Sequence, residues 1–159
     1  MKVNFVRRHV IAALVRGSAW LAGWVATTSC ASDEPPAPDP FPQLARAITG
    51  GEPIRAGRVR IDTPRLADNG HSVPITVRVE SAMTVQEHVR RITLVSESNP
   101  RPLIATFHFT PKSGRAEIST RIRLNKTQRV MALAEFSDGS FWADRAEVIV
   151  TESACLDAD

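Results

Sequence analysis

The sequence predicts an all-β fold: an immunoglobulin-like antiparallel β-sandwich with a short N-terminal helix and a flexible C-terminal arm. From Gly57 onward, apolar residues alternate with polar ones, which is the period of strands that have one buried and one solvent-facing side. Turn-like sequences separate the alternating runs, of which there are seven. Seven short strands with this spacing favour two packed sheets over a barrel.

Length and charge limit the class of protein. The chain has 159 residues, 43% of them hydrophobic and 23% charged, which fits one globular domain. The first 16 positions contain four basic residues and no acidic one, and after residue 31 there are 16 basic and 17 acidic side chains. A domain this close to neutral lacks the basic surface of a nucleic-acid binder. We therefore expect no nucleic-acid partner.

Residues 1–31 have the composition of a cleavable export signal. A basic start is followed by twelve apolar or small residues, Gly17 to Thr28, and then by small residues up to Ala31. A helix of twelve residues spans only about 18 Å, too little to cross a bilayer. We expect cleavage after Ala31, a periplasmic mature protein and no membrane association after cleavage. Arg7-Arg8 leaves the twin-arginine and the Sec export routes both open.

A proline-rich segment and a short helix follow the signal. Residues 32–42 contain five prolines in eleven positions, a composition typical of an extended tether. Gln43 to Thr49 can form a helix that Gly50-Gly51 ends, with Pro42 at its first position. The sandwich domain is predicted to comprise residues 43–151, and the arm residues 152–159.

The seven alternating runs place the strands along the chain. Their inward-facing residues are expected to be the apolar member of each alternating pair. These residues are Val59 and Ile61; Val73, Ile75, Val77 and Val79; Ile92 and Leu94; Leu103, Ala105, Phe107 and Phe109; Ala116, Ile118, Thr120, Ile122 and Leu124; Val130, Ala132, Ala134 and Phe136; and Trp142 with Val148-Ile149-Val150.

Two features of the turns and strands carry further predictions. Asp138-Gly139 lies between two apolar runs and predicts a tight hairpin. Pro74 lies inside a run. Because proline cannot donate a hydrogen bond to a neighbouring strand, it predicts that this strand is at a sheet edge or that the residue forms a bulge.

No set of residues typical of an enzyme is found. The histidines after the signal are His71, His88 and His108, and none has a partner at metal-ligand spacing. The serines near glycines belong to turns, and there is no glycine-rich phosphate loop. We therefore expect no metal and no catalytic residues.

The two cysteines, Cys30 and Cys155, have different expected fates. Cys30 lies in the signal, and Thr27, three places before it, is a poor match to a lipoprotein signal. Removal with the signal is thus favoured over lipidation. Cys155 is the only cysteine after the signal and lies four residues beyond Thr151. A lone thiol in an exported protein indicates an intermolecular bridge or a reactive group.

Four segments of the chain resemble SoxY, the sulfur-carrier subunit of bacterial thiosulfate oxidation. They are LADNGHSVPITVRVES (66–81), NPRP with the ATFHF strand (99–109), SGRAEISTRIRL (113–124) and AEFSDGSFWADRAEVIVT (134–151). The resemblance implies an immunoglobulin-like sandwich and a heterodimer with a second sandwich subunit, SoxZ. It also implies a C-terminal swinging arm whose cysteine, here Cys155, holds sulfur intermediates for separate periplasmic sulfur-oxidising enzymes, with no other cofactor.

The C-terminal arm departs from the family's usual ending, GGCGG. In this chain the cysteine lies in Ser153-Ala154-Cys155-Leu156-Asp157, without the glycines that let a backbone enter a narrow channel. The arm is similar instead to that of a SoxY-related group ending in AACIE, so the resemblance leaves open whether thiosulfate is the substrate.

Two hypotheses follow. The first is a periplasmic covalent carrier, not itself an enzyme, that presents a sulfur intermediate on Cys155 to partner enzymes. The alternative is an immunoglobulin-like binding or structural subunit whose Cys155 forms an intermolecular disulfide.

Overall fold

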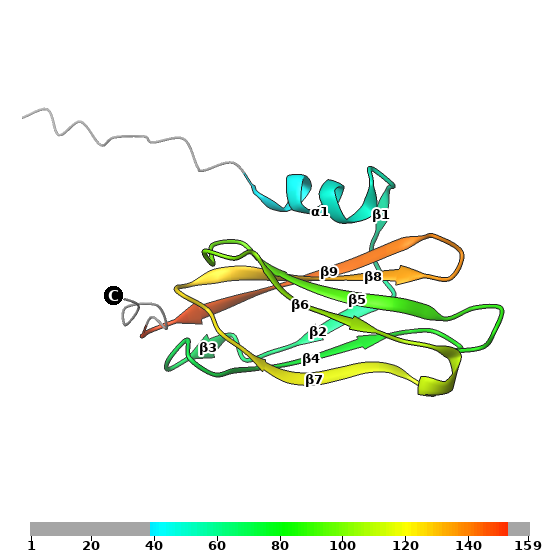
Figure 1. Ribbon diagram of the computed structural model, residues 1–159. Coiled ribbons are helices and arrows are strands. Elements are labelled where there is room, and N and C mark those ends of the chain that lie inside the picture. The colour runs from blue at the N-terminus through cyan, green and yellow to red at the C-terminus, as the bar shows by residue number, and fades with distance from the viewer. Residues whose placement is uncertain (1–38, 153–159) are drawn as a thin grey trace, which may run out of the picture. The chain divides into compact units, whose positions relative to one another are not determined.

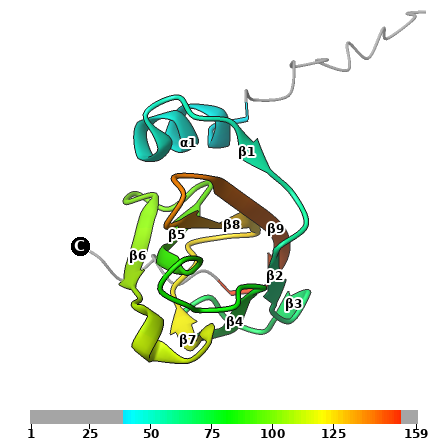
Figure 2. The same ribbon diagram turned by 90° about the vertical axis from the view of Figure 1, so that its right-hand side faces the viewer.

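The computed structural model describes residues 39–152, which fold as a two-sheet β-sandwich with one α-helix and confirm the predicted fold class (Figure 1). The larger sheet has the order β1-β9-β8-β5-β6, with β3 also paired to β9, and the smaller sheet has the order β2-β4-β7 (Figure 2). The elements are α1 (Phe41–Thr49), β1 (Ile54–Arg55), β2 (Val59–Asp62), β3 (Leu66–Ala67), β4 (Val73–Val79), β5 (Val89–Ser96), β6 (Leu103–His108), the 3-10 helix η1 (Pro111–Ser113), β7 (Ala116–Ile122), β8 (Gln128–Phe136) and β9 (Phe141–Val150).

Each of the seven predicted runs lies mostly within a strand of four residues or more, with Phe109 and Leu124 just beyond the ends of theirs. The expectation that Leu103 and Ile149 face inward was wrong, because they are 56% and 38% exposed. The last two parts of the pattern, Trp142 and Val148-Ile149-Val150, belong to one strand, β9. The predicted hairpin at Asp138-Gly139 joins β8 to β9, and Gly139 takes a left-handed φ of 81° there. This left-handed conformation explains why a glycine occupies the position, because residues with a Cβ rarely adopt it.

The core lies between the two sheets. The inward side chains of β4, namely Val73, Ile75 and Val77, are at most 2% exposed, and so are Ile92 and Leu94 of β5. Each such side chain contributes about 1.5–3 kcal/mol through its removal from water. Most of the stability of the sandwich therefore comes from this contact between sheets, which gives the loops at its ends a rigid support.

The helix α1 covers part of the outer face of the larger sheet. Phe41 and Ala45 pack against Val95 and Met131 and form a second apolar cluster. The predicted helix is thus present, but it begins two residues earlier than Gln43, because Phe41 anchors its first turn in this cluster. Its end is as predicted, with Gly50 in the left-handed conformation at φ 68°.

This cluster corrects the prediction that every strand has one solvent-facing side. In β5 and β8 the residues Ile92–Ser96 and Val130–Ala134 are buried on both faces. The outer positions Val95 and Met131 are buried because α1 packs on them. The corresponding signal in the sequence is a continuous apolar run in place of alternation, which is typical of a strand covered on both sides.

Two strands of two residues each were not predicted. β1 pairs with the start of β9, Ile54 opposite Phe141, and β3 pairs with its end, Leu66 opposite Ile149. Both pairings are parallel, so the sandwich is not purely antiparallel. Strands this short carry no alternation that a sequence pattern could reveal.

The prediction for Pro74 was wrong. It lies in β4, the middle strand of the smaller sheet, opposite Arg121 of β7 and without a bulge. Proline is tolerated because the neighbour on the other side, β2, ends at Asp62 opposite Thr76, before it reaches Pro74. On the side of β2, therefore, no strand lies beside Pro74 that would need a hydrogen bond from its backbone nitrogen.

Several predictions concern residues outside the described part of the chain. These are the export signal 1–31 with Cys30, the tether up to residue 38, and the flexible C-terminal arm from residue 153 on with Cys155. Within residues 39–152, no helix is both long enough and apolar enough to cross a membrane.

Candidate functional site

The end of β9 is the part of the described structure from which the chain continues to Cys155. It is fastened to the segment around β3 by backbone hydrogen bonds. Ile149 N donates to Arg65 O at 2.8 Å, and Thr151 N donates to Ala67 O at 3.1 Å. The strand β9 is therefore paired to its last residue, Val150, and one residue beyond.

Thr151 and Glu152 continue this attachment past the strand. The Thr151 hydroxyl donates to Asp68 O at 2.5 Å. Gly70 N donates to Glu152 O at 2.8 Å, and Leu124 N donates in turn to Gly70 O at 2.9 Å. The predicted turn Asp68-Asn69-Gly70 thus holds the last described residue of the chain.

A second contact reaches the same point from the loop between β7 and β8. Val150 N donates to the Thr127 hydroxyl oxygen at 2.9 Å, and that hydroxyl lies 3.3 Å from Val150 O, to which it donates. The end of β9 is thus hydrogen-bonded on both sides.

Behind this loop lies a network of side-chain amides. Gln128, which is 3% exposed, donates from Nε2 to Asn99 Oδ1 and Asn125 Oδ1, both at 2.8 Å. Its own Oε1 accepts from Ser98 N at 2.9 Å, and Asn125 Nδ2 donates to Ser98 O at 2.7 Å. A buried amide whose donors and acceptor are all used stabilises one loop arrangement, so the loops at this end form a rigid base.

An ion pair also belongs to this base. Arg129 donates to both carboxylate oxygens of Glu97, at 3.0 Å from Nε and 2.7 Å from Nη2. This bidentate hydrogen bonding holds the pKa of Glu97 below its usual range, and it raises the pKa of Arg129. Arg129 also contacts Asp39, at 3.3 Å, and thereby connects the base to the start of the described chain.

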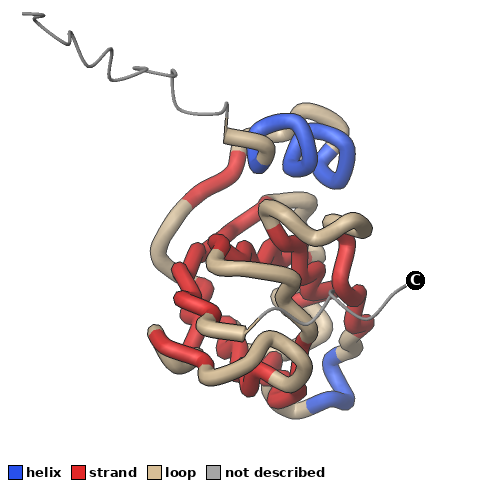
Figure 3. Tube along the Cα trace, turned by 90° about the vertical axis from the view of Figure 1, so that its left-hand side faces the viewer, coloured by secondary structure: helices blue, strands red, loops and turns tan. Residues whose placement is uncertain are grey.

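Cys155 lies outside the described residues, but covalent geometry limits where its backbone can be. Cys155 follows Glu152 by three positions, and a fully extended chain spans at most about 3.6 Å per residue, or roughly 11 Å here. Figure 3 looks directly at the end of the sandwich from which this reach is counted.

The three histidines do not form a site. His71 is exposed beside a turn, His108 is exposed on β6, and His88 is half-buried with Nδ1 3.1 Å from Thr84 O. Among residues 39–152, no group of three His, Cys, Asp or Glu side chains is placed to hold a metal ion.

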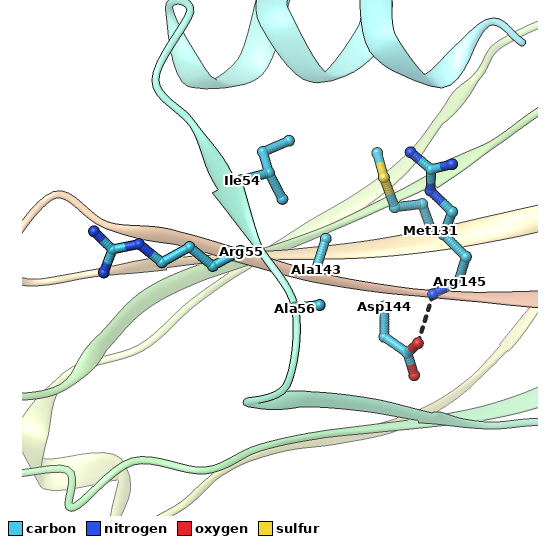
Figure 4. A pocket seen from close by; sticks show the side chains of 7 residues that line it. All are labelled: Ile54, Arg55, Ala56, Met131, Ala143, Asp144 and Arg145. Carbon is cyan, nitrogen blue, oxygen red and sulfur yellow. Dashed lines mark hydrogen bonds between the residues drawn. The ribbon is translucent and has the colours of Figure 1, made fainter.

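A separate hollow lies between β1 and the middle of β9 (Figure 4). It has a volume of about 400 Å³ and is lined by Ile54, Arg55 and Asp144, among others. Both oxygens of the Asp144 carboxylate already accept backbone hydrogen bonds, from Ile61 N at 2.9 Å and Arg145 N at 2.8 Å. The only carboxylate that lines this hollow thus stabilises the fold.

Sequence reasoning did not find Thr127, Gln128 or Thr151 as part of the base. Their hydroxyl and amide groups are common in loops, and only the fold brings the three loops together. The turn at Asp68-Asn69-Gly70 was predicted, but not that its glycine would bind the C-terminal segment.

Comparisons with known proteins identify the family. The protein-family model described as "Sulfur oxidation protein SoxY" matches residues 45–155. The solved structure of the sulfur carrier protein SoxY from Chlorobium limicola f thiosulfatophilum is similar, with 27% identity and a TM-score of 0.59 over 70% of this chain and 96% of that one. No match is found among curated proteins.

A superoxide reductase (neelaredoxin) from Ignicoccus hospitalis is also similar, with 16% identity and a TM-score of 0.55 over 61% of this chain and 94% of that one. Identity this low shows a shared fold alone. The match to the SoxY family, in contrast, covers most of the sequence and includes Cys155. The chain belongs to the SoxY family of sulfur oxidation proteins.

Proposed function

We propose that this protein is a periplasmic covalent carrier of sulfur-compound oxidation, which holds its cargo on the thiol of Cys155 and is acted on by separate enzymes. The observation that carries the proposal is the SoxY family match, which extends through Cys155. Cys155 is also the only cysteine after the predicted signal, so it has no intramolecular partner with which to form a disulfide.

The chemistry is exchange at sulfur. The Cys155 thiolate attacks the electrophilic sulfur of a donor R–S–X held by a partner enzyme. A Cys155 S–S–R bond forms, the S–X bond breaks, X leaves with the electron pair, and the thiol proton goes to solvent. The donor arrives already oxidised, so loading needs no further oxidant and no resident cofactor on this chain.

The thiol depends on the partner for activation. Glu152, Asp157 and Asp159 are acidic neighbours in the sequence, and nearby negative charge disfavours a thiolate. Control of the reaction by the enzyme suits a carrier, because a thiol that reacts slowly in solution is loaded mainly where an enzyme presents its donor.

The fastened end of β9 supports delivery from one place. Hydrogen bonds from Gly70 and Thr151 hold the chain as far as Glu152, so only the residues beyond it can carry the thiol away from the sandwich. A rigid base with a short reach lets successive enzymes find the cargo at the same position.

We further propose a SoxZ-like sandwich subunit as the partner in a heterodimer. One lateral side of the sandwich, the open side, ends in the edge strands β6 and β7, which have no neighbour beyond them in residues 39–152. There Phe107, Phe109 and Ile118 are only partly buried, and Leu103 is 56% exposed. Unpaired backbone with apolar side chains is suited to binding a strand of another sandwich.

The location is part of the proposal. The composition of residues 1–31 predicts export to the periplasm by the twin-arginine or the Sec route, where the sulfur-oxidising enzymes of this proposal act.

The test is the intact mass of the protein purified without reductant from its own host, grown on a reduced sulfur compound. We expect a mass adduct on Cys155 that a thiol reductant removes. The Cys155→Ser variant should unfold at the same temperature as the wild type and carry no adduct. A matched Ser153→Ala variant, changed two residues away, should be loaded normally.

Two results would contradict the carrier. An adduct that persists in Cys155→Ser places the cargo elsewhere. A bare thiol, or a disulfide dimer that is stable in cells, would favour the alternative of a binding subunit joined to its partner by Cys155.

A further inference from the structure

The end of the sandwich that carries residue 152 is here called the arm end. It consists of the loops 63–72, 97–102 and 123–127 together with the end of β7, which includes Arg121, and the end of β9, all at the left of Figure 1. Hydrogen bonds join these loops: Leu124 N to Gly70 O, Gly70 N to Glu152 O, and Asn99 Nδ2 to Arg123 O at 2.8 Å. Side chains on the three loops therefore surround the point where the chain continues to Cys155.

The arm end has an excess of unpaired positive charge. Five exposed basic side chains, here called the basic collar, make no ion pair with any residue from 39 to 152. The exposed carboxylates at this end that make no ion pair within the same range are Asp68, Glu147 and Glu152, while Glu97 is held by Arg129. The basic collar consists of Arg65, Arg101, Arg121, Arg123 and Lys126.

The opposite end of the sandwich, formed by the loops 80–88, 109–115 and 137–140, is balanced in comparison. Its charged residues largely neutralise each other: Glu87 pairs with Arg58, and Arg115 pairs with Glu117. Those without an ion pair inside the described chain are Lys112, Glu80 and Asp138, and also Arg90 at the adjoining start of β5. The excess of positive charge is thus a property of the arm end and not of the surface in general.

The arm end also has an exposed apolar spot. Leu66 is 57% exposed and lies opposite Ile149, which is 38% exposed. Leu66, Pro64, Asn69 and Ser72 line a shallow hollow of about 250 Å³. An apolar centre with charged residues around it is the usual composition of a protein docking surface.

The short reach of Cys155 makes contact at this surface unavoidable. Its backbone can extend at most roughly 11 Å from Glu152. An enzyme pocket that receives the thiol must therefore bring its rim against the loops of the arm end, and the charges of the rim meet the basic collar.

We infer that the arm end is a docking surface for an acidic protein rim, namely the entrance of the enzymes that exchange cargo at Cys155. The inference rests on the proposed function. Carboxylates around an enzyme's entrance pair with the basic collar, and an apolar side chain of the rim fits beside Leu66. Complementary charge raises the rate of encounter about 10–10³-fold and falls off as salt is added.

Two variants with the same change of charge test the inference. Arg123→Glu/Lys126→Glu reverses two charges of the basic collar. Arg90→Glu/Lys112→Glu reverses two exposed charges, likewise without ion pairs in the described chain, at the other end of the strands. Only backbone atoms of Arg123 and Arg90 take part in the hydrogen bonds of these loops, so both variants should keep the thermal stability of the wild type.

The first measurement uses a probe that replaces the enzyme. The probe is a glutamate-rich peptide whose cysteine is activated as a pyridyl disulfide. Cys155 attacks the sulfur of that cysteine, a mixed disulfide forms and pyridine-2-thione is released. A glutamine-rich peptide with the same group is the neutral control. For the wild type at low salt we expect the acidic peptide to react about tenfold faster than the neutral one. The preference should disappear at 0.5 M NaCl and in the collar variant, and it should persist in the control variant. Equal rates for both peptides with the wild type would overturn the inference.

The second measurement is made in the host, by intact mass at short times after a reduced sulfur compound is supplied to starved cells. Slower loading of the collar variant alone supports docking. Equal loading of all three proteins overturns the inference and leaves the carrier function intact. A wild type that is never loaded overturns both. If the collar variant loads normally but loses wild-type binding to phosphatidylglycerol vesicles, the basic collar serves a lipid surface, and the inference is wrong.

Discussion

The two lateral sides of the sandwich differ in how their edges are treated. On the closed side, β9 is flanked at its start by β1 and at its end by β3, and between them the Asp144 carboxylate accepts a hydrogen bond from Ile61 N of β2. On the open side, β6 and β7 have no such cover among residues 39–152. Because exposed strand edges attract other strands, the difference indicates which side is available to a partner.

The largest expected effect concerns the closed side. Asp144→Ala leaves the backbone donors of Ile61 and Arg145 without their carboxylate, and we expect a loss of about 2 kcal/mol in the free energy of unfolding. Asp144→Asn retains one acceptor oxygen and should lose about half as much. Urea unfolding measures both, and an unchanged midpoint for Asp144→Ala would mean that this link does not stabilise the closed side.

A smaller effect is expected where β3 holds the end of β9. Thr151→Val removes the hydroxyl that donates to Asp68 O, and we expect a loss of about 1 kcal/mol. Thr151→Ser keeps the hydroxyl and should be close to the wild type. Hydrogen exchange of the Gly70 amide, which donates to Glu152 O, should become faster in Thr151→Val. An unchanged exchange rate would mean that the Thr151 hydroxyl does not hold the end of β9.

The Glu97–Arg129 ion pair makes the free energy of unfolding depend on pH. The pKa of Glu97 is lowered by its hydrogen bonds to Arg129. Its contribution is therefore present above the ordinary carboxyl pKa of about 4.3 and is lost as the pH falls through the lowered value of the folded state. Below pH 4.5 the free energy of unfolding should fall less in Glu97→Gln than in the wild type, by a difference of less than about 1 kcal/mol. Urea unfolding from pH 3 to 6 measures this difference. The same slope in both proteins would exclude this pair as its source.

The smallest effect on stability is expected on the open side. Leu103→Lys replaces an exposed apolar side chain of β6, so the free energy of unfolding should change by less than about 0.5 kcal/mol. Association with the SoxZ-like subunit, measured by sedimentation of the mixed proteins, should weaken strongly. Val85→Lys makes the same kind of change at a residue that is 78% exposed in the loop between β4 and β5, and it should leave association unaffected. Equal association of both variants would remove the open side from the proposed interface.

The contrast between the sides also separates what the sequence could predict from what it could not. The long strands β4 and β7 each contain enough alternating apolar positions to show their period. Gly50 and Gly139 mark the ends of α1 and of the last hairpin because their left-handed backbone requires glycine. These features depend on neighbours in the sequence, so they can be predicted locally.

The closed side could not be predicted, because it depends on residues far apart. Ile61 and Asp144, or Ala67 and Val150, are brought together only once the sheets exist. The candidate site shows the same division. Cys155 is found from the sequence as a lone thiol, and it remains a prediction, whereas the base formed by Gly70, Thr127 and Thr151 required the fold.

The cover on β9 has a consequence for the order in which the protein folds. The last strand must meet β1 and β3, whose residues precede it by more than 80 positions. Closing loops of this length makes folding slow, and until it is complete the edges of the early strands stay exposed. A chain that emerges N-terminus first cannot complete the sandwich before β9 emerges. The last step of folding should therefore be limited by the arrival of this strand.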